Sequence, residues 1–159
     1  MQVIQTKLTG VRIFEPDVFS DQRGCFFESW NRRRYQEMGL AEDFVQDNVS
    51  FSQRGVLRGL HFQNPQSQGK LIQVLQGEVL DVAVDIRVGS PTFGDWVSVE
   101  LSEQNHRQLY IPAGFAHGFA VVSETVIFSY KCTDYYNHAA EGGVLWNDPD
   151  LGICWPVRE

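Results

Sequence analysis

The residues best able to do chemistry lie in two short segments of the chain. The first is Arg58-Gly-Leu-His61-Phe-Gln63, followed by Lys70, and the second is Pro112-Ala-Gly-Phe-Ala-His117. An imidazole titrates near neutral pH and can take up or return a proton, whereas an ammonium group is a cation that repels metal ions. A histidine and a lysine in one site therefore indicate acid–base chemistry on a substrate that is anionic or forms an enolate.

The two segments resemble the paired sequence signatures of a cupin barrel that has lost most of its metal ligands. A metal-binding cupin supplies two histidines at H-x-H spacing, then a glutamate, and a third histidine after P-x-G. Here Gln63 occupies the second histidine position, and no glutamate stands between it and Lys70. Because transition metals prefer imidazole and carboxylate ligands, we expect no metal ion and no other cofactor in this site.

Length and composition limit the class of protein further. A chain of 159 residues with 43% hydrophobic residues suits one domain, and we expect residues 1–159 to form it. A net charge of −7 leaves no basic stripe for nucleic acid, and no segment is apolar enough to span a membrane. The three cysteines lack C-x-x-C spacing, so we expect reduced, buried thiols in a cytoplasmic protein.

Strand patterns dominate the chain, and turn residues such as Gly55, Gly77 and Gly94 punctuate them. One helix is predicted from about Asn31 to Met38, with Gly39 ending it. The segments predicted as strands are 11–14, 24–28, 44–46, 71–75, 79–86, 96–101, 108–111, 118–122 and 126–130. Short strands at this spacing predict an all-β jelly roll, the double-stranded β-helix of the cupins, with one or two short helices and a ligand site at its mouth.

A series of longer motifs also runs along the chain. They are Phe14-Glu-Pro-Asp-Val-Phe19, Asp21-Gln-Arg-Gly24, Phe44-Val-Gln-Asp-Asn48, Val56-Leu-Arg-Gly-Leu-His-Phe-Gln63, Asp81-Val-Ala-Val-Asp-Ile-Arg87, Ser90-Pro-Thr-Phe-Gly94, Ile111-Pro-Ala-Gly-Phe-Ala-His-Gly118 and Trp146-Asn-Asp-Pro-Asp150. Together they resemble the dTDP-4-dehydrorhamnose 3,5-epimerase family over nearly the whole chain. The resemblance implies a cupin-type jelly roll, usually a homodimer, that acts on a dTDP-linked 4-keto-6-deoxy hexose on the route to activated L-rhamnose.

The resemblance also implies roles for individual residues. Epimerisation beside a ketone needs a base, an acid on the opposite face of the carbon, and a positive charge near the enolate oxygen. By resemblance, His61 is the base, Tyr130 is the acid and Lys70 is the cation. The residues implied to hold the substrate, with its nucleotide and diphosphate, are Arg23, Phe26, Glu28, Gln46, Asp47, Asn48, Arg58, His117 and Glu141.

The remaining polar and aromatic residues have plainer interpretations. His106 and His138 have no motif around them and are expected at the surface, whereas Asp81 is a candidate carboxylate that orients His117. Further aromatic residues are expected to pack or to line the rim of the site: Tyr135, Tyr136, Trp146 and Trp155.

One departure from the family leaves alternatives open. Family members commonly continue beyond Trp155-Pro156 into a segment whose aspartate pairs with the catalytic histidine, whereas this sequence stops at Glu159. We expect a shortened form, another carboxylate in that role, or a protein that binds the sugar nucleotide without epimerising it. The classes that remain are a 3,5-epimerase, with mono-epimerisation or 3,4-ketoisomerisation as sibling activities, a non-catalytic sugar-nucleotide-binding cupin, and a metal-dependent cupin oxygenase or isomerase. The motifs favour the first.

Overall fold

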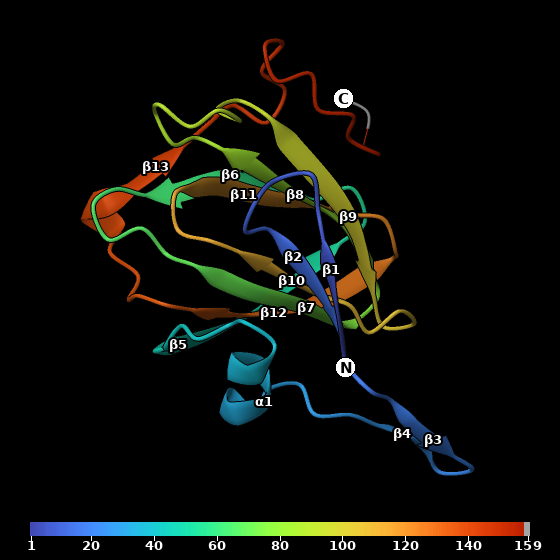
Figure 1. Ribbon diagram of the computed structural model, residues 1–159. Helices are drawn as coiled ribbons and strands as arrows, with labels where there is room; N and C mark the ends of the chain where they lie inside the picture. Colours follow the sequence, from blue (N-terminus) through green and yellow to red (C-terminus); the bar gives the residue numbers. More distant parts are fainter. Residues whose placement is uncertain (158–159) are drawn as a thin grey trace.

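The computed structural model describes residues 1–157, and nearly all the regular structure in them is β-strand (Figure 1). A short helix, α1 (Arg32–Glu37), follows the fourth strand, and a 3₁₀ turn, η1 (His138–Ala140), precedes the last one. The strands are β1 (Gln2–Gln5), β2 (Arg12–Glu15), β3 (Phe19–Asp21), β4 (Gly24–Phe26), β5 (Gln46–Gln53), β6 (Leu57–Gln63), β7 (Lys70–Gln76), β8 (Glu78–Asp85), β9 (Trp96–Ser102), β10 (Gln108–Ile111), β11 (Phe115–Val121), β12 (Thr125–Cys132) and β13 (Glu141–Gly143).

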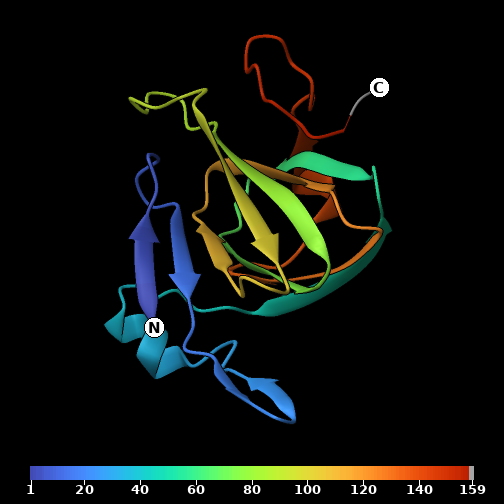
Figure 2. The same ribbon diagram turned by 90° about the vertical axis from the view of Figure 1, so that its right-hand side faces the viewer.

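Two antiparallel sheets lie face to face and form the jelly roll (Figures 1 and 2). One sheet has the order β1-β2-β10-β7-β12-β5, and the other has the order β13-β6-β11-β8-β9. Strands that are neighbours in space are often distant in sequence, as where β12 lies between β7 and β5. This arrangement confirms the predicted all-β, cupin-type fold with two short helical segments.

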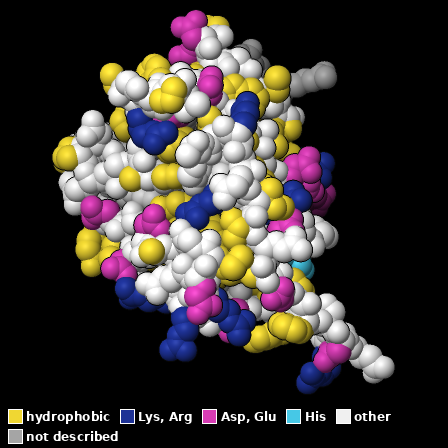
Figure 3. Space-filling view, viewed as in Figure 1, with side chains coloured by type: hydrophobic (Ala, Val, Ile, Leu, Met, Phe, Trp, Pro, Cys, Tyr) yellow, Lys and Arg dark blue, Asp and Glu magenta, His cyan; other side chains and the backbone are white. Residues whose placement is uncertain are grey.

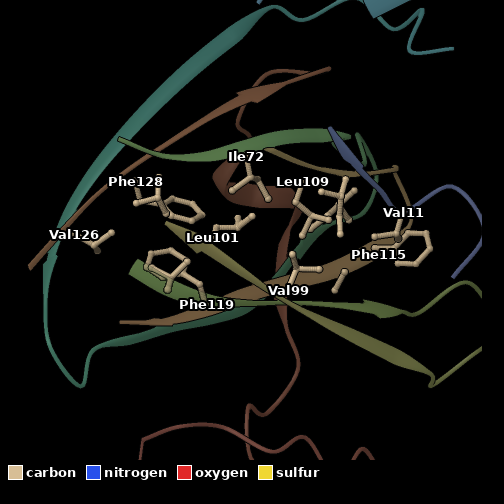
Figure 4. Packing of buried hydrophobic residues seen from close by; sticks show 14 of the residues in the cluster. Val11, Ile72, Val99, Leu101, Leu109, Phe115, Phe119, Val126 and Phe128 are labelled. Carbon is tan, nitrogen blue, oxygen red and sulfur yellow. The ribbon is translucent and has the colours of Figure 1, made fainter. Parts of the chain in front are cut away.

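The space between the sheets is filled by inward-facing apolar side chains (Figure 4). Successive residues of a strand point to opposite faces, so alternate positions of each strand enter this core. Phe119 of β11 and Phe128 of β12 meet across it, with ring centroids 4.0 Å apart and nearly parallel planes. The sheets are therefore held together by direct contact between β11 and β12, two strands that also carry His117 and Tyr130.

Other segments cover part of the outer face of each sheet. Helix α1 places Tyr35 against Phe14 and Tyr110 on the outside of the six-stranded sheet. The chain after β13 covers the outside of the five-stranded sheet, where Trp155 packs with Leu60 and other apolar residues. The Trp155 indole also donates a hydrogen bond to the Trp146 carbonyl oxygen at 2.7 Å. The packing role predicted for Trp155 is thus confirmed.

The two-stranded hairpin of β3 and β4 extends away from both sheets, at the lower right in Figures 1 and 3. Its cross-strand pair of Phe19 and Phe26 leaves both rings about two-thirds exposed, at 65% and 68% of their full surface. Arg23 at its tip forms an exposed ion pair with Asp21 at 2.6 Å. Few of its contacts are to the rest of the chain.

Several predicted elements need correction. Asn31 caps helix α1 and Gly39 follows it with φ +92°, as the sequence predicted. Of the segment predicted as a strand at 44–46, only Gln46 lies in a strand, as the first residue of β5, which runs on to Gln53. No strand was predicted for β1, β3, β6 or β13. The inward faces of β5 and β6 are polar. These two strands therefore lack the alternation of apolar and polar residues from which a strand is predicted.

The expected environment of the cysteines and of one histidine was also partly wrong. Cys132 is buried as predicted, but Cys25 and Cys154 are exposed thiols because they lie on the projecting hairpin and the C-terminal segment. His138 is exposed, whereas His106 is half-buried with its ring 5.0 Å from that of Phe27. No helix within residues 1–157 is both long and apolar enough to cross a membrane.

Candidate active site

The three residues proposed for the chemistry lie near one another, and they come from both sheets. His61 lies on β6 of the five-stranded sheet, directly opposite His117 of β11. Lys70 and Tyr130 lie on the neighbouring strands β7 and β12 of the six-stranded sheet. Because the sheets face each other, the candidate base and the candidate acid approach the space between them from opposite sides.

His61 is exposed to solvent. Loss of hydration lowers the pKa of His61 below its usual 6.5, and the positive charges of Lys70 and Arg58 lower it further. The nearby Glu141 carboxylate opposes this by stabilising the protonated ring. A neutral imidazole is the form that can accept a proton, so the site keeps His61 competent as a base at neutral pH.

His117, by contrast, is fixed by a buried carboxylate. Its Nε2 lies 2.8 Å from Oδ2 of Asp81, and both side chains are almost fully buried. Ionised Asp81 requires a proton on that nitrogen and leaves Nδ1 as the free nitrogen of the ring. Burial raises the pKa of Asp81, while His117 and Lys70 act to lower it. The predicted pairing of Asp81 with His117 is confirmed.

Tyr130 and Lys70 form the other wall. The Lys70 Nζ atom lies over the Tyr130 ring, 5.5 Å from its centre, and Tyr130 follows Phe128 along the inner face of β12. Burial raises the pKa of the Tyr130 phenol and lowers that of the Lys70 ammonium below its usual 10.5. Tyr130 therefore keeps its proton over a wide pH range, while Lys70 brings a positive charge into a poorly hydrated space where that charge acts strongly.

Gln63, at the position of a lost metal ligand, has a structural function. Its Oε1 accepts a hydrogen bond from the Asn137 backbone N–H at 2.9 Å. Its Nε2 donates to the carbonyl oxygens of Gln66 at 2.8 Å and Tyr135 at 3.2 Å. Gln63 thus joins β6 to the loop before η1. Within residues 1–157, no three His, Cys, Asp or Glu side chains cluster as metal ligands.

Polar residues from both sheets surround the mouth. Arg58 of β6 donates a hydrogen bond from Nε to the Ser52 hydroxyl of β5 at 2.9 Å, which links the two sheets. The Tyr136 hydroxyl donates to Oε2 of Glu141 at 2.7 Å. Gln46 and Asn48 lie on the inner face of β5, opposite Cys132 and Tyr130. These residues place a guanidinium, a carboxylate, two amides and an aromatic ring around the entrance.

Four of the predicted substrate-binding residues lie elsewhere in this chain. Asp47 points to the outer face of the sheet, where it forms an ion pair with Lys131 at 3.0 Å. Arg23 and Phe26 lie on the projecting hairpin, and Glu28, just after it, pairs with Arg34 at 3.0 Å. Phe26 and Glu28 line a separate groove beneath the hairpin. The fold therefore brings His61, Tyr130 and Lys70 together with Gln46, Asn48, Arg58, His117 and Glu141, but not with these four.

The family model described as dTDP-4-dehydrorhamnose 3,5-epimerase matches residues 5–159. The chain belongs to this family. A dTDP-4-dehydrorhamnose 3,5-epimerase of Salmonella typhimurium is 56% identical over 161 residues, which cover 100% of this chain and 88% of that protein. The epimerase family is thus established by sequence along the length of the chain.

Solved structures of the epimerase family agree with the fold. The Legionella pneumophila dTDP-6-deoxy-D-glucose-3,5-epimerase in complex with dTDP-4-keto-L-rhamnose superposes with a TM-score of 0.96 and 55% identity, covering 99% of this chain and 85% of that one. The Bacillus anthracis dTDP-4-dehydrorhamnose 3,5-epimerase with TDP and pyrophosphate bound gives 0.97 and 50%, covering 99% and 91%.

Two site residues of this epimerase-family chain were missed from the sequence. Cys132 was predicted to be a buried spectator, yet it lies two residues beyond Tyr130 on the same face of β12 and opposite Lys70. Tyr136 was predicted only as a packing or rim residue, and its contact with Glu141 was not foreseen. The two-residue period of a strand would have placed Cys132 beside Tyr130 once the strand was extended past it.

Proposed function

We propose that this protein epimerises C3 and C5 of dTDP-4-dehydro-6-deoxy-D-glucose to give dTDP-4-dehydro-L-rhamnose, in dTDP-L-rhamnose biosynthesis for cell-surface polysaccharides. The observation that carries this proposal is the placement of His61 and Tyr130 on opposite sheets, with Lys70 near both of them. Inversion at a carbon requires the proton to leave from one face and another to arrive at the opposite face. Two proton-transfer groups on facing walls meet that requirement.

The remaining chemistry follows from the charges around the cavity. His61 removes the proton of the carbon next to the C4 ketone, and the electron pair moves onto the ketone oxygen. Lys70 stabilises the enolate oxygen, and Tyr130 donates a proton to the carbon from the other side. C3 and C5 both adjoin the same ketone, so one cation at the C4 oxygen can serve both inversions.

The nucleotide portion is proposed to bind at the mouth. Arg58 is suited to a diphosphate, because a guanidinium can make two parallel hydrogen bonds to phosphate oxygens. Gln46, Asn48, His117 and Glu141 add polar contacts from the surrounding strands. Lys70 and Arg58 make this pocket basic in a protein whose net charge is −7.

We further propose that the active unit is a homodimer. The outer face of the six-stranded sheet exposes an apolar patch formed by Val49, Phe51 and Leu75, which are 66%, 60% and 48% exposed. A second copy covering this patch would bring its hairpin, with Arg23, Phe26 and Glu28, to the site of the first. Asp47, on the same outer face, would then lie at the interface.

Light scattering should give twice the monomer mass, and Phe51→Asp should return the mass to that of one chain.

Two broader features complete the proposal. Residues 1–159 are proposed to act as one catalytic domain, because the site draws on strands from β5 to β13 and on both sheets. A cytoplasmic location is supported by the cysteines, all three of which are free thiols.

Proton NMR of the protein with dTDP-4-keto-6-deoxy-glucose in D₂O tests the activity. If the protein is a 3,5-epimerase, both the C3 and the C5 proton signals should disappear and the L-sugar should form. Loss at one carbon would instead define a mono-epimerase. Binding of the sugar nucleotide without any exchange would contradict the proposal and define a binding protein.

A further inference from the structure

Asn48 is the direct cross-strand partner of the proposed acid. In the pairing of β5 with β12, Asn48 lies opposite Tyr130 and Gln46 lies opposite Cys132. Cross-strand partners in an antiparallel sheet project from the same face, so the Asn48 amide and the Tyr130 phenol stand side by side on the inner wall. Asn48 is half-buried there, which limits the competition of water for its hydrogen bonds.

The orientation of the Asn48 amide is set from a distance by a backbone group. The Tyr136 N–H can only donate, and it donates to Oε1 of Gln46 at 3.0 Å. This contact turns Nε2 of Gln46 towards Oδ1 of Asn48, to which it donates at 3.0 Å. Because the oxygen of Asn48 is already used, the amide presents its NH₂ group to the inner wall.

The NH₂ group of Asn48 has two protons to donate. One is directed at Sγ of Cys132, 3.8 Å away. The other is available to Tyr130, the cross-strand partner of Asn48, and Asn48 partly offsets the increase in the pKa of Tyr130 that burial causes. A phenol oxygen that accepts from Asn48 must direct its own O–H away from that amide.

We propose that Asn48 is a positioning residue that acts through Tyr130, turning the phenol proton towards the substrate carbon and stabilising the phenolate left after proton transfer. In this step the Tyr130 O–H bond breaks, and its electron pair stays on the phenol oxygen. The electron pair of the enolate forms the new C–H bond, and water later returns a proton to the phenolate. This role rests on the proposed function of Tyr130 and differs from the substrate contact that the family resemblance implies for Asn48.

The decisive variant is Asn48→Asp, which keeps the size of the side chain but replaces the donor with an acceptor. The carboxylate still accepts from Gln46, yet it attracts the phenol proton to itself and repels a phenolate. Proton abstraction by His61 does not depend on this contact. In D₂O, net epimerisation should therefore fall roughly 10- to 100-fold, the worth of one hydrogen bond to a charged group, while deuterium exchange into unconverted substrate continues.

Three further variants test whether the effect comes from the hydrogen-bond donor of Asn48 and acts through Tyr130. Asn48→Ser retains a small donor and should recover part of the lost epimerisation. Gln53→Glu makes the same amide-to-acid change at an exposed position of the same strand and should leave the ratio of exchange to epimerisation unchanged. Tyr130→Phe should raise this ratio by itself, and adding Asn48→Asp to it should raise the ratio no further.

The outcomes separate the two roles of Asn48. A raised ratio with unchanged dTDP affinity supports positioning of the acid. An unchanged ratio with weakened dTDP binding would overturn the inference and leave Asn48 as a nucleotide contact only. If Tyr130→Phe leaves the ratio unchanged, then Tyr130 is not the acid, and both assignments fall together.

Discussion

His61 and His117 are direct cross-strand neighbours, yet within residues 1–157 only His117 has a carboxylate at hydrogen-bonding distance. Asp81 holds the buried His117 ring, while the His61 ring is exposed and is affected by Glu141 only through its charge. The two imidazoles therefore have different properties. His117 has a fixed ring and a fixed partner, whereas His61 is accessible and its pKa is lowered, as a base for the substrate requires.

Replacement of His61 by alanine should remove most of the proton exchange. A positioned general base typically contributes about 10²- to 10⁴-fold to the rate, so exchange at C3 and C5 in D₂O should slow by that factor. His138→Ala, which removes an exposed imidazole from η1, should leave exchange unchanged. Equal rates in wild type and His61→Ala would exclude His61 as the base.

The pH dependence should report the lowered pKa of His61. The base must be neutral, so kcat/KM falls as pH decreases through the pKa of His61. Because partial loss of hydration lowers this pKa below 6.5, the acidic limb of the profile should lie below pH 6.5. Glu141→Gln removes a charge that favours the protonated ring and should move the limb to still lower pH. A shift in the opposite direction would show that Glu141 does not act on His61 by its charge.

Lys70 should govern the alkaline limb. Its charge stabilises the enolate, so activity should fall as pH rises through the pKa of Lys70, which burial places below 10.5. Lys70→Arg should move this limb to higher pH, because a guanidinium stays charged. Lys70→Met should cost roughly 10²- to 10³-fold in kcat, similar to the loss of one oxyanion donor. Full kcat in Lys70→Met would remove Lys70 from the mechanism.

Gln63 should matter for stability rather than for proton transfer. Gln63→Ala leaves the Asn137 N–H and two carbonyl oxygens without their partner, which predicts a loss of about 1–3 kcal/mol in the free energy of unfolding. Urea denaturation measures this loss, with Gln53→Ala at an exposed strand position as the control. A stability equal to wild type would show that water replaces Gln63 at no cost.

The sequence predicted the fold and the central residues for physical reasons that the structure makes clear. Apolar alternation correctly placed most of the strands around the core, such as β8 and β10, because burial selects β-branched and aromatic residues. The pairing of His117 with Asp81 could be proposed because a buried imidazole needs a partner. The roles of His61, Lys70 and Tyr130 came from family motifs, since nothing in a strand pattern separates a reactive tyrosine from a packed one.

Other features could not be predicted from the sequence. The inner face of β5 is polar, so the strand that carries Gln46 and Asn48 lacks the signal by which strands are recognised. Gln63 forms hydrogen bonds with the backbone of Tyr135 and Asn137, which lie more than seventy residues away in the sequence. No local sequence pattern predicts such contacts. The distance of Arg23 and Phe26 from His61 is likewise a property of how the hairpin leaves the sheets.

The projecting hairpin has a consequence for inheritance. Suppose that each site combines His61 of one chain with Arg23 of the other. A chain that is substituted only at His61 then still contributes an intact hairpin to the site of its partner. Two defective variants, His61→Ala and Arg23→Ala, would then complement each other when they associate, because each hybrid pair holds one site in which both residues are whole. A cell with both alleles would make L-rhamnose precursors that neither allele supports alone.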